Sequence, residues 1–264
     1  MVTALSVNLN KIAWLRNARG GNRPDVSEAA RGIIDAGAQG ITVHPRPDQR
    51  HIHPRDVREL ALLLRSEHPG IEFNIEGNPA ARARRNGYPG FDRLIEEARP
   101  HQATLVPDAD SQLTSDHGWD LSDSRAAMRV AETIARYQGW GARVSLFMDP
   151  DERQIQRARA CGADRIELYT GPYAELVERH GLSDARVRSC RRTYRDAARY
   201  AVEMGLGVNA GHDLNLDNLA DFIAIGNIDE VSIGHALISD ALDFGLAATV
   251  RKYLDAIAAA GGTA

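Results

Sequence analysis

Short apolar runs recur along the chain, and longer segments with helical spacing of apolar residues separate them. The runs are rich in Val, Ile, Leu and Phe, which favours β-strands. We expect eight strands, over Ala4–Asn10, Gly40–His44, Glu72–Gly77, Gln102–Pro107, Arg143–Asp149, Arg165–Gly171, Gly207–His212 and Glu230–His235.

The segments between these runs carry the start and stop signals of helices. Pro24-Asp25 precedes the first of them and Gly37 follows it, as is typical of helix ends. We expect helices over Val26–Ala36, Pro54–Glu67, Pro79–Asn86, Phe91–Ala98, Ser122–Tyr137, Asp151–Cys161, Asp184–Met204, Leu216–Ile225 and Ser239–Ala260.

Strands that alternate with helices form right-handed βαβ units and a parallel sheet. Eight such units in 264 residues match the length of a closed (β/α)8 barrel, which needs about 250 residues. The alternatives are an open doubly wound sheet and two smaller domains. We predict an α/β protein of the TIM barrel class, with residues 1–264 forming a single domain.

Composition narrows the possible functions. The formal charge of −4 and the 43% hydrophobic content suit a globular protein, and they argue against a nucleic-acid partner. No apolar run is long enough to span a membrane, and no signal peptide is evident. Cys161 and Cys190 form no C-x-x-C pair, which favours a reducing compartment, the cytoplasm. Only Lys11 and Lys252 are lysines, which disfavours a Schiff-base enzyme.

Polar residues gather at the predicted carboxyl ends of the strands, where a barrel keeps its active site. The ends carry Asn8 and Asn10, His44, Glu76, Asp108, Asp149, Glu167 with Thr170, Asn209 with His212, and His235. We therefore expect His44, Glu76, His212 and His235 to meet on one rim.

The stretch Gly40–Ile52 (GITVHPRPDQRHI) begins as a strand and continues as a loop that Pro45 and Pro47 keep from being helical. Its two imidazoles and two guanidinium groups suit an anionic substrate such as a phosphate. These four residues are His44, Arg46, Arg50 and His51. The simpler interpretation is a solvated basic loop.

Two glutamates stand on predicted strands. Burial at a strand end would raise the pKa of Glu76 toward the range of a general base, although a salt bridge to an arginine would also explain it. Glu167 alternates with Ile166 and Leu168, so it should face the barrel interior. There it would form a core ion pair or stabilise charge during a reaction.

Gly211-His212 and Gly234-His235 follow the seventh and eighth strands, whose loops commonly hold a phosphate in this fold. His51 and His53 have the spacing of a metal-ligand pair, but they lie in a loop, and the other histidines show no ligand motif. We expect no metal site.

Several longer motifs, in this order, resemble the pyridoxine 5′-phosphate synthase family: VNLNKIAWLRNARGG, GITVHPRPDQRHI, FNIEG, VSLFMD, IELYTG, VNAGH and SIGHALI. The resemblance runs from about residue 6 to residue 246. It implies a barrel with extra helices that form oligomer contacts, in a homo-oligomer built from dimers, such as an octamer. It also implies a cofactor-free condensation of 3-amino-2-oxopropyl phosphate with 1-deoxy-D-xylulose 5-phosphate to pyridoxine 5′-phosphate, phosphate and water.

The resemblance assigns roles by position. His44 and Glu76 match the general bases, His212 the proton donor, and Glu167 the acid that stabilises the transition state. The amino-ketone phosphate would be held by Asn8, Arg19, Gly234 and His235, and the deoxyxylulose phosphate by Arg46, His51 and Thr114.

Two positions depart from the family pattern. Asn10-Lys11 stands where an Asp-His pair is usual, and Asp213 stands where a glycine is usual. A carboxylate beside a phosphate would repel it, so Asp213 is expected to turn away and offer its backbone N–H. These departures concern substrate binding more than the type of reaction.

Two other functions remain open from the residues alone: another phosphosugar isomerase or aldolase, and a barrel that binds a phosphorylated metabolite without converting it. The segment Asp108–Leu121 is too long for an ordinary βα loop. We expect it to act as a lid, with Gly118 as a hinge and Trp119 packing down when it closes.

Overall fold

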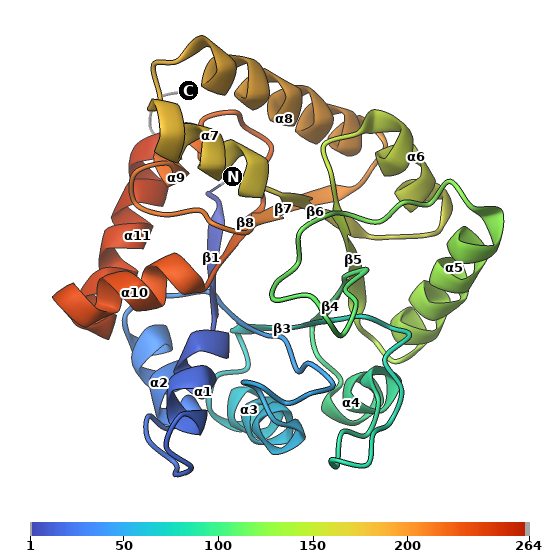
Figure 1. Ribbon diagram of the computed structural model, residues 1–264, viewed down its shortest axis with the longest axis vertical. Helices are drawn as coiled ribbons and strands as arrows, with labels where there is room; N and C mark the ends of the chain where they lie inside the picture. The colour runs from blue at the N-terminus through green and yellow to red at the C-terminus, as the bar shows by residue number, and fades with distance from the viewer. Residues whose placement is uncertain (1, 262–264) are drawn as a thin grey trace.

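The computed structural model describes residues 2–261. Its strands are all parallel, each pairs with its neighbours in sequence, and β1 also pairs with β8, so the sheet closes into a barrel (Figure 1). The strands are β1 (Ala4–Asn8), β2 (Gly40–Val43), β3 (Glu72–Gly77), β4 (Gln102–Leu105), β5 (Arg143–Met148), β6 (Arg165–Tyr169), β7 (Gly207–Gly211) and β8 (Glu230–Ile233). The predicted (β/α)8 TIM barrel is confirmed.

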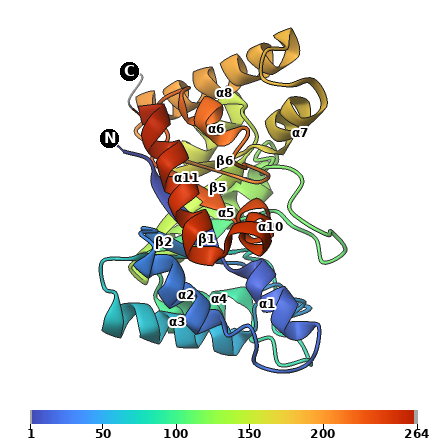
Figure 2. The ribbon, with the colours of Figure 1, turned by 90° about the vertical axis from the view of Figure 1, so that its left-hand side faces the viewer.

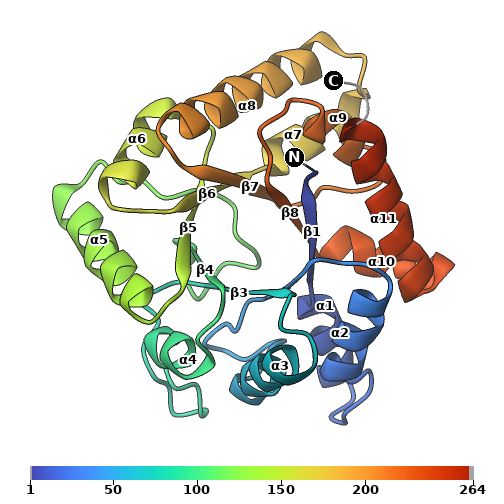
Figure 3. The same cartoon turned by 180° about the vertical axis from the view of Figure 1, so that it is seen from behind.

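Helices form the outer layer, as the views from the front and from behind both show (Figures 1 and 3). They are α1 (Asn10–Asn17), α2 (Val26–Asp35), α3 (Pro54–Glu67), α4 (Phe91–Ala98), α5 (Ser124–Gly139), α6 (Glu152–Ala160), α7 (Gly171–His180), α8 (Ala185–Glu203), α9 (Leu219–Ile223), α10 (His235–Phe244) and α11 (Leu246–Gly261). None of these helices, within the described range, is both long and apolar enough to cross a membrane.

The hydrophobic core lies between the strands and the helices. Leu5 and Val7 of β1 are fully buried there, and α3 contributes Val57, Leu60 and Leu64 from one face. Apolar side chains on alternate strand positions and at helical spacing therefore meet in one ring-shaped layer.

The barrel axis, by contrast, is polar. Ser6, Thr42, Asn74 and Thr104 are almost completely buried and join four successive strands by side-chain hydrogen bonds. Barrels of this class usually fill the axis with Val, Ile and Leu. The interior below the active site is thus a hydrogen-bonded network.

The predicted helix over Pro79–Asn86 is wrong. The segment forms turns, because the Asn78 side chain accepts from the N–H of Ala80 and the N–H of Arg84 donates to the carbonyl of Tyr88. These local bonds replace the helical pattern.

Two helices were not predicted. The first strand ends at Asn8, not Asn10, because the Asn8 side chain accepts from the N–H of Asn10 and α1 begins there. Helix α7 begins at Gly171, the last residue of the predicted strand, with Pro172 in its first turn, where proline is well tolerated.

The last predicted helix, Ser239–Ala260, is two helices. Gly245 adopts φ 77°, which ends α10 and lets α11 begin at Leu246. The other boundaries differ from the predicted ones by a few residues, which is usual at helix and strand ends.

Candidate active site

A cavity of about 390 Å³ lies at the carboxyl ends of the strands. Residues from β1, β3, β5, β6 and β8, from α1 and α10 and from the loops surround it: Asn8, Asn10, Lys11, Trp14, His44, Arg46, His51, Glu76, Val106, Leu113, Thr114, Ser115, Phe147, Glu167, His212, Asp213, Leu214, Ser232, Ile233, Gly234, His235 and Ala236. His44, Glu76, His212 and His235 therefore meet at one rim, as predicted.

Of the fourteen predicted site residues, all except Arg19 line this cavity. Arg19 is exposed and follows the end of α1, so the described chain does not bring it to the other residues. The strand-end pattern therefore predicted which residues meet at this cavity, and their roles in binding and catalysis stay predictions.

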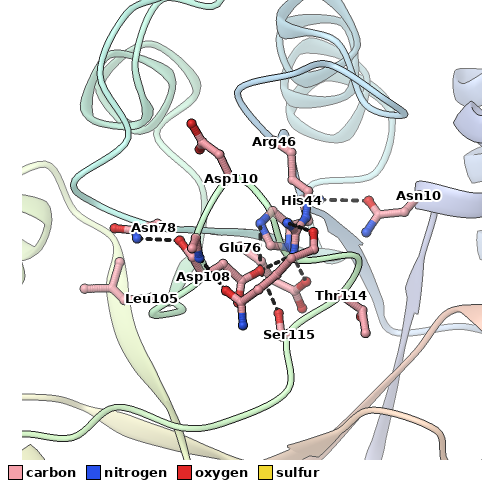
Figure 4. Close-up of polar contacts among 12 residues, drawn as sticks. Asn10, His44, Arg46, Glu76, Asn78, Leu105, Asp108, Asp110, Thr114 and Ser115 are labelled. Carbon is pink, nitrogen blue, oxygen red and sulfur yellow. Dashed lines mark hydrogen bonds and ion pairs between the residues drawn. The ribbon is translucent and has the colours of Figure 1, made fainter.

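His44 lies at the end of β2, between two carboxylates (Figure 4). Its Nδ1 is 3.8 Å from Glu76 Oε2, its Nε2 is 4.0 Å from Asp108 Oδ2, and its backbone N–H donates to Asn10 Oδ1 at 2.9 Å. Burial, and then the charge of Arg46, holds the pKa of the His44 imidazole well below its usual value. The ring is therefore neutral and able to accept a proton.

Glu76 is buried on β3 and accepts from Asn8 Nδ2 at 3.3 Å. Burial, and then the negative charges of Asp108 and Glu230, raises the pKa of its carboxyl to about 8. Within residues 2–261 no arginine lies within ion-pair distance of Glu76, so the salt-bridge alternative is wrong. A carboxyl that titrates near neutral pH suits a general base.

Glu167 faces the barrel interior, as its alternation predicted, and it lines the floor of the cavity. One of its oxygens, Oε2, is buried and unpartnered in the described structure, and the residue forms no core ion pair there. Burial, and then the nearby Glu76, raises the pKa of Glu167 well above its usual value. This shift of the pKa favours the protonated, neutral form of Glu167 beside the substrate space.

Arg46 and His51 present a cation and a neutral ring on the loop after β2. Arg46 pairs closely with Asp108 and donates to the carbonyl of Gln112 at 3.0 Å. Burial, and then Arg46, lowers the pKa of His51 to about 3, and His51 Nδ1 accepts from the N–H of Ile52 at 3.0 Å. The Nε2 of the neutral ring therefore carries the proton and can donate to an anion.

The loop that holds these residues is fixed to α1 by a buried ion pair. Arg16 is 1% exposed, and it contacts Asp56 through two bonds of 2.6 and 2.8 Å. Arg16 also donates to the carbonyl of His51 at 3.2 Å, and Asn17 donates to the same carbonyl at 2.8 Å. This geometry explains the Arg-Asn part of the LRNARG motif, Arg16 and Asn17.

On the other side of β1 from the β2 loop, Gly234 follows β8 and α10 begins at His235, as expected for a phosphate cradle. A Cβ at Gly234 would lie 3.0 Å from the Asn8 side chain, so this close approach requires glycine. The first turn of α10 thus faces the cavity next to Asn8 and His235.

The long loop after β4 lies over the cavity, on the same side as α1, α7 and α10 (Figure 2). Its Thr114 Oγ1 is 2.9 Å from His212 Nε2, and Trp119 donates to the carbonyl of Leu105 at 2.8 Å. A Cβ at Gly118 would strike the backbone of Asp149, so close packing accounts for this glycine. Opening of the loop stays a prediction.

Residues 2–261 contain no cluster of three His, Cys, Asp or Glu side chains that could hold a metal ion. His51 and His53 have other functions: His51 bonds Ile52, and the N–H of His53 donates to Asp56 at the start of α3. The metal-free reaction stays a prediction.

Two residues that shape the site, Ser232 and Ser115, were not predicted, and neither were the partners of a third, Asp108. Ser232 bonds Glu76, and its alternation with Glu230 on β8 could have indicated an inward side chain. Asp108 and Ser115 pair behind Arg46, with Ser115 Oγ donating to Asp108 Oδ2 at 2.9 Å (Figure 4). Asp108 was noticed at a strand end, but no pattern in sequence indicates its partners.

Comparison with known proteins shows the family to which this chain belongs. The family model described as "Pyridoxal phosphate biosynthesis protein PdxJ" matches residues 5–259. Among curated proteins, the chain is 57% identical over 265 residues to the pyridoxine 5′-phosphate synthase of Xanthomonas campestris pv. campestris, covering 100% of both chains. It is 56% identical over 254 residues to the protein of the same name from Xylella fastidiosa, covering 96% of this chain and 94% of the relative.

Solved structures with similar folds are more distant in sequence. One is 3-keto-L-gulonate-6-phosphate decarboxylase from Vibrio cholerae, at a TM-score of 0.60 and 12% identity, covering 97% of this chain and 98% of the other. Another is phosphoribosyl anthranilate isomerase from Thermus thermophilus, at 0.54 and 15%, with the same coverage. These similarities support the barrel fold alone.

Proposed function

From the family to which this chain belongs, that of the pyridoxal phosphate biosynthesis protein PdxJ, we infer that it is a pyridoxine 5′-phosphate synthase. It condenses 3-amino-2-oxopropyl phosphate with 1-deoxy-D-xylulose 5-phosphate, and releases pyridoxine 5′-phosphate, phosphate and water. The observation that carries this function is one cavity lined by proton-transfer groups and by two separate sets of candidate phosphate ligands.

The reaction joins an amine to a ketone, eliminates phosphate and water, and closes an aromatic ring. Each step moves protons, so bases and acids must stand around one substrate space. We assign the bases to His44, whose ring is neutral, and to Glu76, whose carboxyl titrates near pH 8. The neutral ring of His44 can accept a proton near neutral pH, and Glu76 can accept one in its ionised form, whose share grows as the pH approaches 8.

Two further groups complete the proton inventory. Glu167 is protonated and buried, so it can donate a hydrogen bond to an oxygen on which negative charge develops. His212 contacts the loop at Thr114 and is assigned as the proton donor. No cofactor is assigned a part in these steps.

We propose that the two phosphates bind in separate parts of the cavity, on either side of the end of β1. Arg46, His51 and Thr114 would hold the deoxyxylulose phosphate, with Asn10 and Lys11 beside them. The glycine and imidazole at the start of α10, together with Asn8, would hold the amino-ketone phosphate. These are Gly234 and His235.

The test is to mix the two substrates with the purified protein and follow pyridoxine 5′-phosphate by absorbance and inorganic phosphate by a coupled assay. Equal amounts of both products are expected, and His44→Gln should abolish both. A barrel that only binds a metabolite would show binding without product, and an isomerase or aldolase would convert one substrate alone. Either outcome would contradict the synthase.

We further propose that the protein is a homo-oligomer built from dimers, such as an octamer, located in the cytoplasm. Trp14 and Leu15 on α1 are 39% and 55% exposed, which gives the surface near Arg19 an apolar character suited to a partner copy. Light scattering after size-exclusion chromatography will give the number of copies, and a monomer would refute this proposal.

A further inference from the structure

The turn after β7 holds two residues in an unusual backbone conformation. His212 has φ 90° and Asp213 has φ 60°, in the left-handed region that favours glycine. Glycine would adopt the backbone of the second position without strain. The turn therefore carries an aspartate, Asp213, at a position whose backbone conformation favours glycine.

That carboxylate contacts the imidazole of its neighbour. Asp213 Oδ2 lies 2.8 Å from His212 Nδ1, and because a carboxylate only accepts, the Nδ1–H of His212 is the donor. The other ring nitrogen, Nε2, lies 2.9 Å from Thr114 Oγ1, and the ring stands edge-on to Tyr169 at 5.1 Å between centroids. The ring is thus held from three directions.

Neighbouring groups that line the cavity stabilise the negative charge of Asp213. The hydrogen bond from His212 holds the pKa of Asp213 below its usual value against the effect of burial, and the charges of His235 and Lys11 act in the same direction. Asp213 in turn opposes the lowering of the Lys11 pKa by burial. Lys11 and Asp213 therefore stabilise each other's charged forms. A phosphate nearby meets a carboxylate whose negative charge is offset by that of Lys11.

We propose that Asp213 is a positioning residue that fixes the tautomer and orientation of His212, keeping Nδ1 protonated and Nε2 directed toward Thr114 and the cavity. Nε2 is then the atom that gains and gives the proton of the reaction. A carboxylate that orients an imidazole in this way is a general device of acid–base catalysis. The proposal rests on the proposed function in one respect, the assignment of His212 as proton donor.

The activity test compares Asp213→Gly and Asp213→Asn with the unchanged protein. Both variants are expected to lower kcat by about 10- to 100-fold, the usual effect of losing a group that orients a catalytic imidazole, without raising either KM. Asp213→Gly should not lower Tm, because glycine adopts the backbone of this turn freely. Unchanged kcat, or an increase in KM alone, would overturn the proposal.

Asn227→Gly is the matched control. Asn227 is exposed, also has φ 60°, and lies in the turn before β8, away from the cavity. Asn227→Gly also places glycine at a position with a left-handed backbone, and the kcat of this variant should equal that of the unchanged protein. In a His212→Asn background, Asp213→Gly should have no further effect on kcat; an equal loss there would show that Asp213 acts independently of His212 and would overturn the proposal.

A spectroscopic measurement separates this proposal from the proposed function. The ring ¹⁵N resonances of His212 report its tautomer, and the Nδ1–H form should predominate in the unchanged protein and be lost in Asp213→Gly. The same tautomer in both proteins would overturn the positioning role, whatever reaction the protein catalyses. Failure to form pyridoxine 5′-phosphate, with the tautomer shift present, would refute only the synthase function.

Discussion

Replacing Glu76 by glutamine should have two opposite effects: turnover should fall and the fold should become more stable. Glutamine keeps the size of the side chain and resembles the neutral carboxylic acid, but it cannot accept a proton. Loss of a general base lowers the rate by about 10²- to 10⁴-fold. The effect on stability follows from the protonation of the buried carboxyl.

The pKa of Glu76 rises from 4.5 to about 8 on folding. Between these values the folded protein binds more protons than the unfolded chain, so the free energy of unfolding falls as pH rises through this window. At pH 7 the penalty is about 3 kcal/mol. Glu76→Gln removes this penalty, so it should be more stable than the unchanged protein at pH 7 and about equally stable near pH 4.

The assay is urea unfolding of both proteins at several pH values from about 5 to 8, since the difference between the two curves isolates Glu76 from the other buried acids. Glu72→Gln is the control for turnover, because Glu72 lies at the other end of β3 and pairs with Arg143 at 2.6 Å. It should retain kcat. Parallel stability curves for Glu76→Gln and the unchanged protein, or near-normal turnover of Glu76→Gln, would refute the reasoning.

Three further predictions follow from the site. Arg16→Met leaves Asp56 buried without its partner and should cost about 3–5 kcal/mol, a fall in Tm of about 10 °C by calorimetry; an unchanged Tm would contradict this. Residues Asp108–Leu121 should be cleaved more slowly in limited proteolysis when phosphate substrates are bound, and equal cleavage together with unchanged Trp119 fluorescence would argue against a lid. Thorough chelation should leave the rate intact, whereas a loss restored by a divalent ion would favour a metal.

The fold was predictable because each strand carries its own signal. The period of two on β6 placed Glu167 inside the barrel, and a glycine after three of the helices, at Gly37, Gly162 and Gly205, marked the repeat. The helix prediction failed where local hydrogen bonds compete with helix formation. The Ala- and Arg-rich segment Pro79–Asn86 looks helical, but the Asn78 side chain bonds Ala80 and closes a turn instead.

The candidate site was predictable as a set of strand-end residues, because a closed barrel brings all its carboxyl ends together. The hydrogen bonds and ion pairs between these residues were not predictable. That Asp213 would bond His212, and that Asp108 would stand behind Arg46, depends on side-chain directions that no spacing in the sequence encodes. The placement of Arg19 likewise depends on how the chain turns after α1.

The polar axis of the barrel has a consequence for strand alignment. An interior of Val, Ile and Leu would accept a shift of one strand by two residues, because the same face would still be buried. Here Ser6, Thr42, Asn74 and Thr104 pair in sequence around half the circumference, so the same shift would leave buried donors and acceptors without partners. The stagger that closes this barrel therefore depends on directional hydrogen bonds between side chains, and not on packing alone. The same bonds set the relative positions, along the barrel axis, of the candidate catalytic side chains.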